Sequence, residues 1–206
     1  MEKHGVDISR WNKIVDYDTF SHCIDFAIIK AGGSDKGIYK DPTFNKNYTE
    51  LHSRGVPLGA YYFVGRNFLT HEDAIADAKR FIEIIRGLSF EYPVVLDLES
   101  TAPRDKEDVT DACVDFMNYL EESGYYACIY ASDISGFKDR LILDWLTPFD
   151  KWVARYGGKP TYVKEYGIHQ YTSKGDIPGA IGYIDRDVAY KDYPAIMKKT
   201  GYNNVR

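Results

Sequence analysis

Short hydrophobic runs recur along the chain, and most of them are apolar at successive positions rather than at alternating ones. Eight such runs stand out, at 5–9, 26–31, 58–64, 92–98, 126–131, 151–156, 167–171 and 182–185. Continuous apolar segments of this length are typical of strands that are covered on both faces, as in a parallel sheet. The pattern therefore predicts eight strands, several of them buried on both sides.

Segments with helical spacing fill the first five gaps between these runs, at 17–22, 44–54, 71–85, 106–123 and 134–143. Thr70 is a suitable N-cap for the third segment, because acidic residues that suit the helix dipole follow it. Gly55, Gly87 and Gly124 stand where three of the segments stop, as expected just past a helix end. After the sixth run the gaps are short and rich in Gly, Lys, Pro and Thr, which leaves no room for full helices.

An alternation of strands and helices generates right-handed crossovers and a parallel sheet. Eight strands with five main helices predict an α/β fold, a modified TIM-like barrel that is irregular in its last third. A doubly wound open sheet is the alternative fold, but no glycine-rich phosphate loop follows the first strand. Gly32-Gly33 after the second strand is a turn and only a weak sign of such a loop. We expect a single domain over 1–206, with its core at about 4–190 and a short C-terminal extension.

Composition and charge exclude several classes of function. The net charge is −5, and the 26 basic residues are spread among 31 acidic ones, so the chain has no basic stripe for nucleic acid. The apolar runs fall far short of the roughly 18 to 20 residues of a spanning helix, so we expect no membrane insertion. The five histidines have no metal-ligand spacing, and we expect neither a metal nor a cofactor.

Acidic side chains stand at the ends of several predicted strands. The active site of a β/α barrel lies at the C-terminal ends of its strands. Asp7 comes from the first strand, Asp97 and Glu99 from the fourth, and Asp185 from the eighth. Since side chains alternate along a strand, Asp97 and Glu99 point the same way, and we expect both to face the barrel interior.

Two carboxyl groups in a poorly solvated space are expected to differ in pKa. Desolvation and the like charge raise the pKa of one group, while hydrogen bonds to the charged form hold the other ionised. Glycoside hydrolysis requires such a pair, a proton donor at the leaving oxygen and a carboxylate for the positive charge that develops on the sugar. Two other interpretations of these acids stay open. Asp97 and Glu99 could form a polar strand end that caps the next helix, or the four acids could supply oxygen ligands to Mg²⁺ or Mn²⁺.

Six motifs in one order resemble a known family: Gly5-Val6-Asp7-Ile8-Ser9 with Trp11, Phe26-Ala27-Ile28-Ile29-Lys30-Ala31, Gly59-Ala60-Tyr61-Tyr62-Phe63, Pro93-Val94-Val95-Leu96-Asp97-Leu98-Glu99, Trp152-Val153-Ala154-Arg155-Tyr156 and Gln170-Tyr171-Thr172-Ser173. The chain resembles, from Gly5 to about Tyr190, the glycoside hydrolase family 25 lysozymes, N-acetylmuramidases found as phage endolysins and bacterial autolysins. The resemblance implies a (β/α)5β3 barrel. It also implies cleavage of the β-1,4 bond between N-acetylmuramic acid and N-acetylglucosamine in cell-wall peptidoglycan.

The resemblance places the catalytic glutamate of the family on Glu99, its partner on Asp97, and two further active-site acids on Asp7 and Asp185. Asp187 stands where the family more often has asparagine. The sequence therefore leaves open whether Asp185 or Asp187 faces the mouth. Our hypothesis is that Glu99 acts as general acid and later as base. Asp97 then orients the substrate's own 2-acetamido group as it attacks the anomeric carbon, which gives retention. Asp7 and Asp185 would position that group or a water.

Five strand-end residues are candidates for sugar binding by stacking and hydrogen bonding: Lys30, Tyr62, Trp152, Gln170 and Tyr171. The 18 tyrosines and 3 tryptophans suit such a surface. The family usually continues Lys-Ala with Thr or Ser, Glu and Gly, whereas this chain has Gly32-Gly33-Ser34. The sugar contacts of this loop are therefore expected to differ from those of the family.

Two alternatives to a muramidase fit these residues less well. A chitinase-like enzyme of family 18 carries Asp-x-x-Asp-x-Asp-x-Glu on its fourth strand, but Tyr92 and Val95 occupy the first two acidic positions here. A non-catalytic carbohydrate-binding barrel would usually lack one of the acids, and both Asp97 and Glu99 are present.

The sequence also suggests where such an enzyme acts. We expect no wall-binding module in these residues and therefore a single-domain enzyme or a catalytic fragment. Since the first residues lack the apolar segment of a secretory signal, we expect synthesis in the cytoplasm and action on the cell wall after release.

Overall fold

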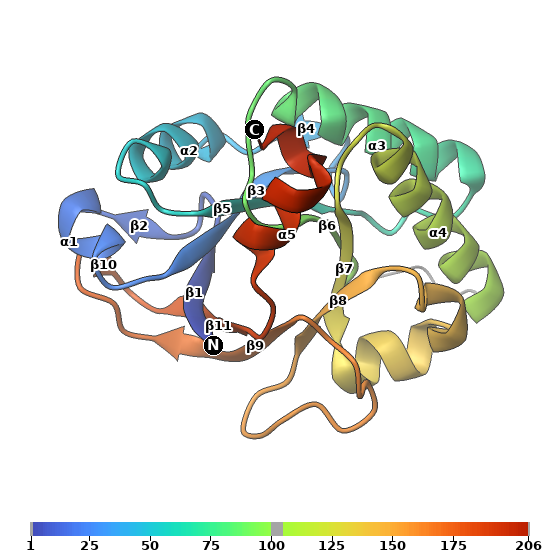
Figure 1. The fold of residues 1–206 in the computed structure, drawn as a ribbon. Coiled ribbons are helices and arrows are strands. Elements are labelled where there is room, and N and C mark those ends of the chain that lie inside the picture. The colour runs from blue at the N-terminus through green and yellow to red at the C-terminus, as the bar shows by residue number, and fades with distance from the viewer. Residues whose placement is uncertain (1, 100–104, 206) are drawn as a thin grey trace.

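Eight strands close into a barrel in the computed structural model, which describes residues 2–99 and 105–205 (Figure 1). β1 pairs with both β11 and β3, which completes the ring. Every one of the eight hydrophobic runs overlaps one barrel strand, so the predicted number of strands is confirmed. The barrel strands are β1 (Lys3–Ile8), β3 (Phe26–Gly33), β5 (Leu58–Phe63), β6 (Val94–Asp97), β7 (Ala127–Ser132), β8 (Asp150–Ala154), β9 (Ile168–Gly175) and β11 (Ile184–Ala189).

Helical segments follow the first five barrel strands, as predicted, and residues 150–189 contain none. The fifth segment is irregular, a π-helix followed by a short 3-10 helix. No helix within 2–99 and 105–205 has the length and apolar character needed to cross a bilayer. The segments are α1 (Tyr17–Ser21), α2 (Phe44–His52), α3 (His71–Ile85), α4 (Lys106–Glu122), η1 (Asp133–Lys138) and η2 (Leu143–Leu146).

The prediction of a parallel sheet is wrong for one strand, β11. All neighbouring barrel strands are parallel except those beside β11, which runs antiparallel to both β9 and β1. A parallel neighbour requires a crossover of a dozen or more residues, usually a helix, and the connection at 176–183 is too short for one. Asp185 therefore lies at the beginning of β11, not at its end. The reversal nevertheless brings it to the mouth, where it is the register partner of Asp7.

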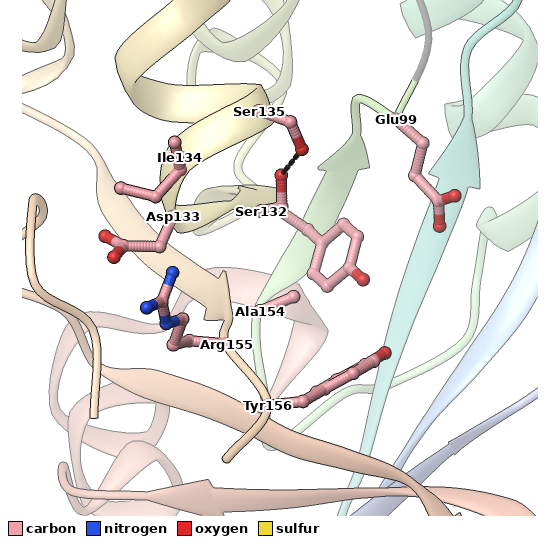
Figure 2. Close-up of a pocket in the computed structure, with 9 residues that line it drawn as sticks. Glu99, Ser132, Asp133, Ile134, Ser135, Ala154, Arg155 and Tyr156 are labelled. Carbon is pink, nitrogen blue, oxygen red and sulfur yellow. Dashed lines mark hydrogen bonds between the residues drawn. The ribbon is translucent and has the colours of Figure 1, made fainter. Parts of the chain in front are cut away.

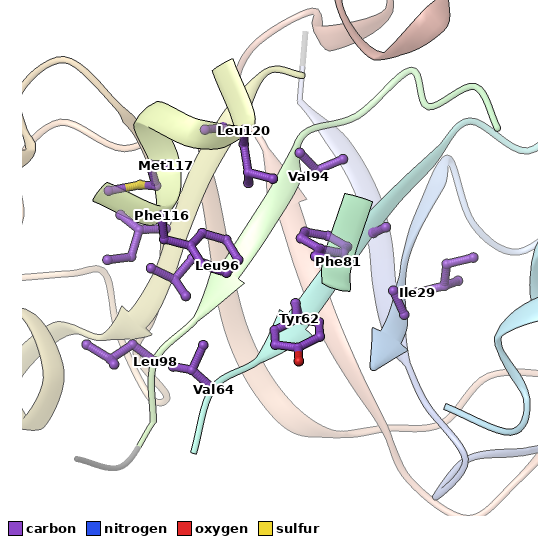
Figure 3. Close-up of a cluster of buried hydrophobic side chains, with 14 of the residues drawn as sticks. Ile29, Tyr62, Val64, Phe81, Val94, Leu96, Leu98, Phe116, Met117 and Leu120 are labelled. Carbon is purple, nitrogen blue, oxygen red and sulfur yellow. The ribbon is translucent and has the colours of Figure 1, made fainter. Parts of the chain in front are cut away.

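Outward-facing side chains of the strands pack against the helices in a continuous apolar layer (Figure 3). Leu96 of β6 meets Phe116 and Met117 of α4, and the ring of Tyr62 lies 5.6 Å from that of Phe81 on α3. Because the strands are covered outside by helices and inside by other strands, apolar residues suit both faces. This explains why alternation is rare in their sequences.

One end of the barrel is closed by aromatic rings. Phe26 stacks on Tyr92 with ring centroids 4.2 Å apart. A Cβ atom at Gly5 would lie 2.5 Å from the Phe26 ring, so only glycine fits beside this stack. The C-terminal helix α5 (Tyr193–Thr200) lies across the same end (Figure 1). The ring of its buried Tyr193 packs with its centroid 5.2 Å from that of Tyr92. The predicted C-terminal extension is thus part of the barrel floor.

Two short strand pairs lie outside the ring of eight. β2 (Lys13–Ile14) pairs with β10 (Ala180–Ile181), and β4 (Tyr39–Lys40) pairs with the last residues of β3. Both extend from loops that follow or precede barrel strands at the end opposite to the aromatic floor, and Tyr39 and Lys36 line the cavity there. The barrel therefore has one filled end and one open, polar mouth.

We expect Phe26→Ala to lower the free energy of unfolding by about 3 to 5 kcal/mol, because it removes a fully buried ring from the floor. Urea unfolding followed by circular dichroism measures this loss. The control is Ile38→Ala, which shortens a side chain that is 55% exposed and should change stability by no more than about 0.5 kcal/mol. Similar losses for the two variants would contradict this account of the floor.

Candidate active site

The inward-facing side chains near the mouth are neighbours because of strand register. Lys30 of β3 pairs with Tyr61 of β5, and Asp97 of β6 with Tyr130 of β7. Around the rest of the ring, Tyr130 pairs with Trp152, and Asp7 with Asp185. A cavity of about 320 Å³ lies over these residues, and its lining includes Asp7, Lys30, Tyr61, Asp97, Glu99, Trp152, Gln170 and Asp185. All four predicted acids are therefore brought together.

A second cavity, of about 390 Å³, adjoins the first. The two share Glu99, Tyr130 and Tyr156 in their linings. Figure 2 shows Glu99 and Tyr156 entering this second space from opposite walls, with Ser132, Asp133, Ser135 and Arg155 on its far side. Glu99 thus lies at the junction of two hollows, where an extended ligand that occupied both would cross it.

Glu99 and Asp97 differ in their access to solvent. Asp97 is only 4% exposed, whereas the side chain of Glu99 reaches the open cleft. Within 2–99 and 105–205, Oδ1 of Asp97 is buried and has no hydrogen-bond partner. Burial raises the pKa of Glu99, and burial together with the charge of Glu99 raises the pKa of Asp97 well above its usual value. The sequence predicts hydrogen bonds that hold one of these two carboxyl groups ionised. No such bond to either side chain is seen among the described residues.

Lys30 supplies positive charge close to both acids and lowers the pKa of each. Its ammonium group lies 4.3 Å from the ring centroid of Phe63 and 5.6 Å from that of Tyr61. It forms no ion pair with any acid in the described part of the chain. Aromatic faces attract a cation without using its N–H donors. Lys30 can therefore offer hydrogen bonds to a ligand in the mouth.

Gln170 organises the opposite side of the mouth. Its Nε2 donates to Oδ2 of Asp7 over 2.7 Å, and its Oε1 accepts from the hydroxyl groups of Tyr130 and Tyr156 over 2.9 and 2.8 Å. The amide is thus largely used within the protein, and it fixes three groups that line the cleft. The pKa of Asp7 is raised well above its usual value by burial, then by the charges of Asp187 and Asp185.

Both Asp185 and Asp187 point into the barrel, at different depths. Asp185 is half-buried and lines the cavity, and burial together with the charge of Glu99 raises its pKa to about 6. Asp187 lies one inward position deeper and is fully buried. The indole Nε1 of Trp152 donates to its Oδ1 over 2.8 Å, which fixes the ring at the base of the mouth. Asp185 is therefore the acid that faces the open cleft.

Two of the predicted sugar-binding residues are not in the cleft. Tyr62 faces the helices, where its hydroxyl donates to Asp77 over 3.0 Å, and Tyr61 lines the cavity instead. The prediction is wrong because β5 is apolar on both faces, so its sequence does not reveal which tyrosine points inward. Tyr171 lies on the opposite face of β9 from Gln170, with its ring 6.3 Å from that of His169.

Three tyrosines of the cleft, Tyr61, Tyr130 and Tyr156, were missed by the sequence analysis. Tyr130 and Tyr156 stand at the ends of the fifth and sixth predicted strands, so the strand-end rule that identified the acids could also have found them. In the same described residues, no group of three His, Cys, Asp or Glu side chains is arranged to hold a metal ion.

The family model described as glycosyl hydrolases family 25 matches residues 6–180. The autolytic lysozyme of Clostridium acetobutylicum is 26% identical over 185 residues, which cover 89% of this chain and 54% of that protein. The chain therefore spans about half the length of this relative.

Solved structures with the same fold cover nearly all of the chain. The CTP1L endolysin aligns with a TM-score of 0.82 and 29% identity, over 96% of this chain and 70% of that one. The autolysin LytC from Streptococcus pneumoniae in complex with a synthetic peptidoglycan ligand aligns with a TM-score of 0.77 and 25% identity, over 92% and 47% of the two chains. Since the family model matches well over half of its residues, the chain belongs to the glycosyl hydrolases of family 25.

Proposed function

We propose that this chain is a muramidase that hydrolyses the β-1,4 bond between N-acetylmuramic acid and N-acetylglucosamine in bacterial peptidoglycan. The observation that carries the proposal is the position of Glu99, a solvent-accessible acid of raised pKa beside the buried Asp97, at the junction of two cavities. The autolytic lysozyme and the peptidoglycan complex of LytC support this choice of substrate. The enzyme acts on the cell wall.

Glu99 is the general acid. Its raised pKa keeps the carboxyl protonated at a pH where an ordinary glutamate is ionised, so it can give a proton to the leaving oxygen. A glycan strand that occupies both cavities would place one glycosidic bond over this group. The same carboxylate, once ionised, removes a proton from the water that completes hydrolysis.

Asp97 is the partner of the 2-acetamido group of the sugar. The acetamido oxygen attacks the anomeric carbon while the bond from that carbon to the leaving oxygen breaks and Glu99 protonates that oxygen. The carboxyl group of Asp97 lines the mouth cavity, and its Oδ1 has no partner within 2–99 and 105–205, so this group is suited to accept the acetamido N–H as positive charge develops. Lys30 offsets part of the effect of burial and of Glu99 on the pKa of Asp97.

The remaining cleft residues position the sugar. Asp7 and Asp185 lie on adjoining strands across the mouth from Asp97 and are placed to orient the acetamido group or the attacking water. Lys30 and Trp152 line the same cavity as candidate sugar contacts, while Gln170 acts mainly by holding Asp7. At the rim, the side chain of Trp11 is 76% exposed, and its ring faces the guanidinium of Arg10 at 4.9 Å. An exposed indole beside a cleft suits stacking on a sugar face.

Glu99→Gln should abolish the clearing of purified Gram-positive cell walls, with a loss of about 10² to 10⁴-fold in rate, because glutamine cannot donate the proton. Loss of turbidity measures the rate. The control is Glu83→Gln on α3, which removes a carboxylate from an exposed pair with Arg80 and should clear walls at the rate of the unmodified enzyme. Equal clearing by the Glu99 variant and the unmodified enzyme would contradict this role. No clearing by either would contradict the muramidase activity and favour a non-catalytic carbohydrate-binding barrel.

The stereochemistry of the product tests the role of Asp97. Participation of the acetamido group requires two displacements at the anomeric carbon, so the first reducing ends released should be β anomers. Proton NMR during the first minutes of hydrolysis distinguishes them from α anomers, before mutarotation mixes the two. Initial release of the α anomer would show a single displacement by water and would rule out the substrate-assisted route.

A further inference from the structure

A second pair of acids lies just below the mouth and has no part in proton transfer at Glu99. Asp187 is 0% exposed and Asp7 is 7% exposed. Asp187 is the register partner of Gly5, so it lies one inward position below Asp7 on the adjoining strand. Each carboxyl group is a close neighbour of the other and influences its charge. Two acidic side chains thus meet where neither is well solvated.

Each acid also has one donor from a neutral side chain. Trp152 Nε1 donates to Oδ1 of Asp187 over 2.8 Å, and Gln170 Nε2 donates to Oδ2 of Asp7 over 2.7 Å. Oδ2 of Asp187 is buried and receives no hydrogen bond from any donor in the described ranges. A carboxylate accepts hydrogen bonds but cannot donate one, so contact between these two groups requires a proton on one of them.

The charges around the pair do not neutralise it. On β11 itself, Asp185 adds negative charge, and Arg186, which alternates to the other face, adds a weak opposing charge. Asp7 on β1 also has Asp97 nearby across the mouth. The strands β8 and β9 contribute Trp152 and Gln170, neither of which titrates, and the floor side is apolar. Neither acid forms an ion pair with a cation in the part of the chain that the structure describes.

We propose that Asp187 is a positioning residue that shares a proton with Asp7, and that this proton-bridged pair holds Asp7 and, through Gln170, the tyrosines of the cleft. With the proton present, the pair carries one negative charge and is joined by a strong hydrogen bond. Loss of the proton at alkaline pH places two buried negative charges in contact, which drives the groups apart. Gln170 then loses the orientation that holds Tyr130 and Tyr156.

The direction of the pH effect follows from burial. Burial raises the pKa of Asp187 to about 8 and that of Asp7 well above its usual value, so the folded chain holds a proton that the unfolded chain has lost above a pH of about 4. Stability therefore falls as the pH rises through this window. An asparagine at position 187 would donate an amide N–H to Asp7 and still accept from Trp152, without titrating.

The test compares Asp187→Asn, Asp187→Leu and the unmodified enzyme in two measurements between pH 5 and pH 9. The first is kcat/KM on purified cell walls, which rests on the proposed function. The alkaline limb should move upward by about one pH unit or more in Asp187→Asn. Asp187→Leu should lose about 10 to 100-fold at every pH, because it can neither bridge to Asp7 nor accept from Trp152. Asp176→Asn, which removes an exposed acid, should keep the unmodified profile.

The second measurement is thermal unfolding at pH 5 and pH 8, which does not depend on hydrolysis. The unmodified chain should lose more in Tm between these values than Asp187→Asn does, since the shared proton is absent from the variant. The same alkaline limb and the same change in Tm for both chains would overturn the proposal. If no chain hydrolyses cell walls, the muramidase assignment fails, and the unfolding measurement still decides whether Asp7 and Asp187 share a proton.

Discussion

The pairing of β1 with both β3 and β11 closes the barrel and determines which charged side chains meet at its mouth. β1 contributes Asp7, and its two neighbours bring Lys30 on one side and Asp185 with Asp187 on the other. β11 reaches this position only by running antiparallel, because the short connection after β9 cannot carry a helix. Without closure at β1, the acids of β6 and β11 would lie at separated positions along an open sheet. Closure is therefore what converts scattered carboxylates into one site.

Burial then gives these acids their chemistry. Carboxyl groups that converge in a barrel lose much of their hydration, and desolvation is the largest cause of the raised pKa values of Asp7, Asp97, Glu99, Asp185 and Asp187. Lys30 lies beside Asp97 and Glu99 and offsets part of the rise there. The deeper pair, Asp7 and Asp187, receives neutral donors instead. The mouth thus combines an acid that reaches solvent with others that are held below it.

Burial of apolar side chains in the rest of the barrel offsets the free-energy cost of desolvating the acids at the mouth. Phe26, Tyr92 and Tyr193 fill the floor. Helix α5 covers it (Figure 1), and the polar cavity lies at the other end. On the outside, a continuous layer between strands and helices fixes the strands against one another (Figure 3). Rigid strands in turn hold side chains such as Gln170 and Trp152 in single orientations, as a preorganised site requires. The polar mouth is therefore supported from below and from the sides.

The sequence by itself determined the eight strands, the five helical segments and the convergence of Asp7, Asp97 and Glu99, because apolar runs, helix caps and strand-end positions are local signals. Asp185 joins them only because β11 runs antiparallel. It did not determine which of Tyr61 and Tyr62 faces the cleft, since a strand buried on both faces carries no alternation to read. It predicted the wrong direction for β11 and left the depth of Asp187 undecided. Those depend on how the last strands close against β1, and on the burial that follows, which only the tertiary structure fixes.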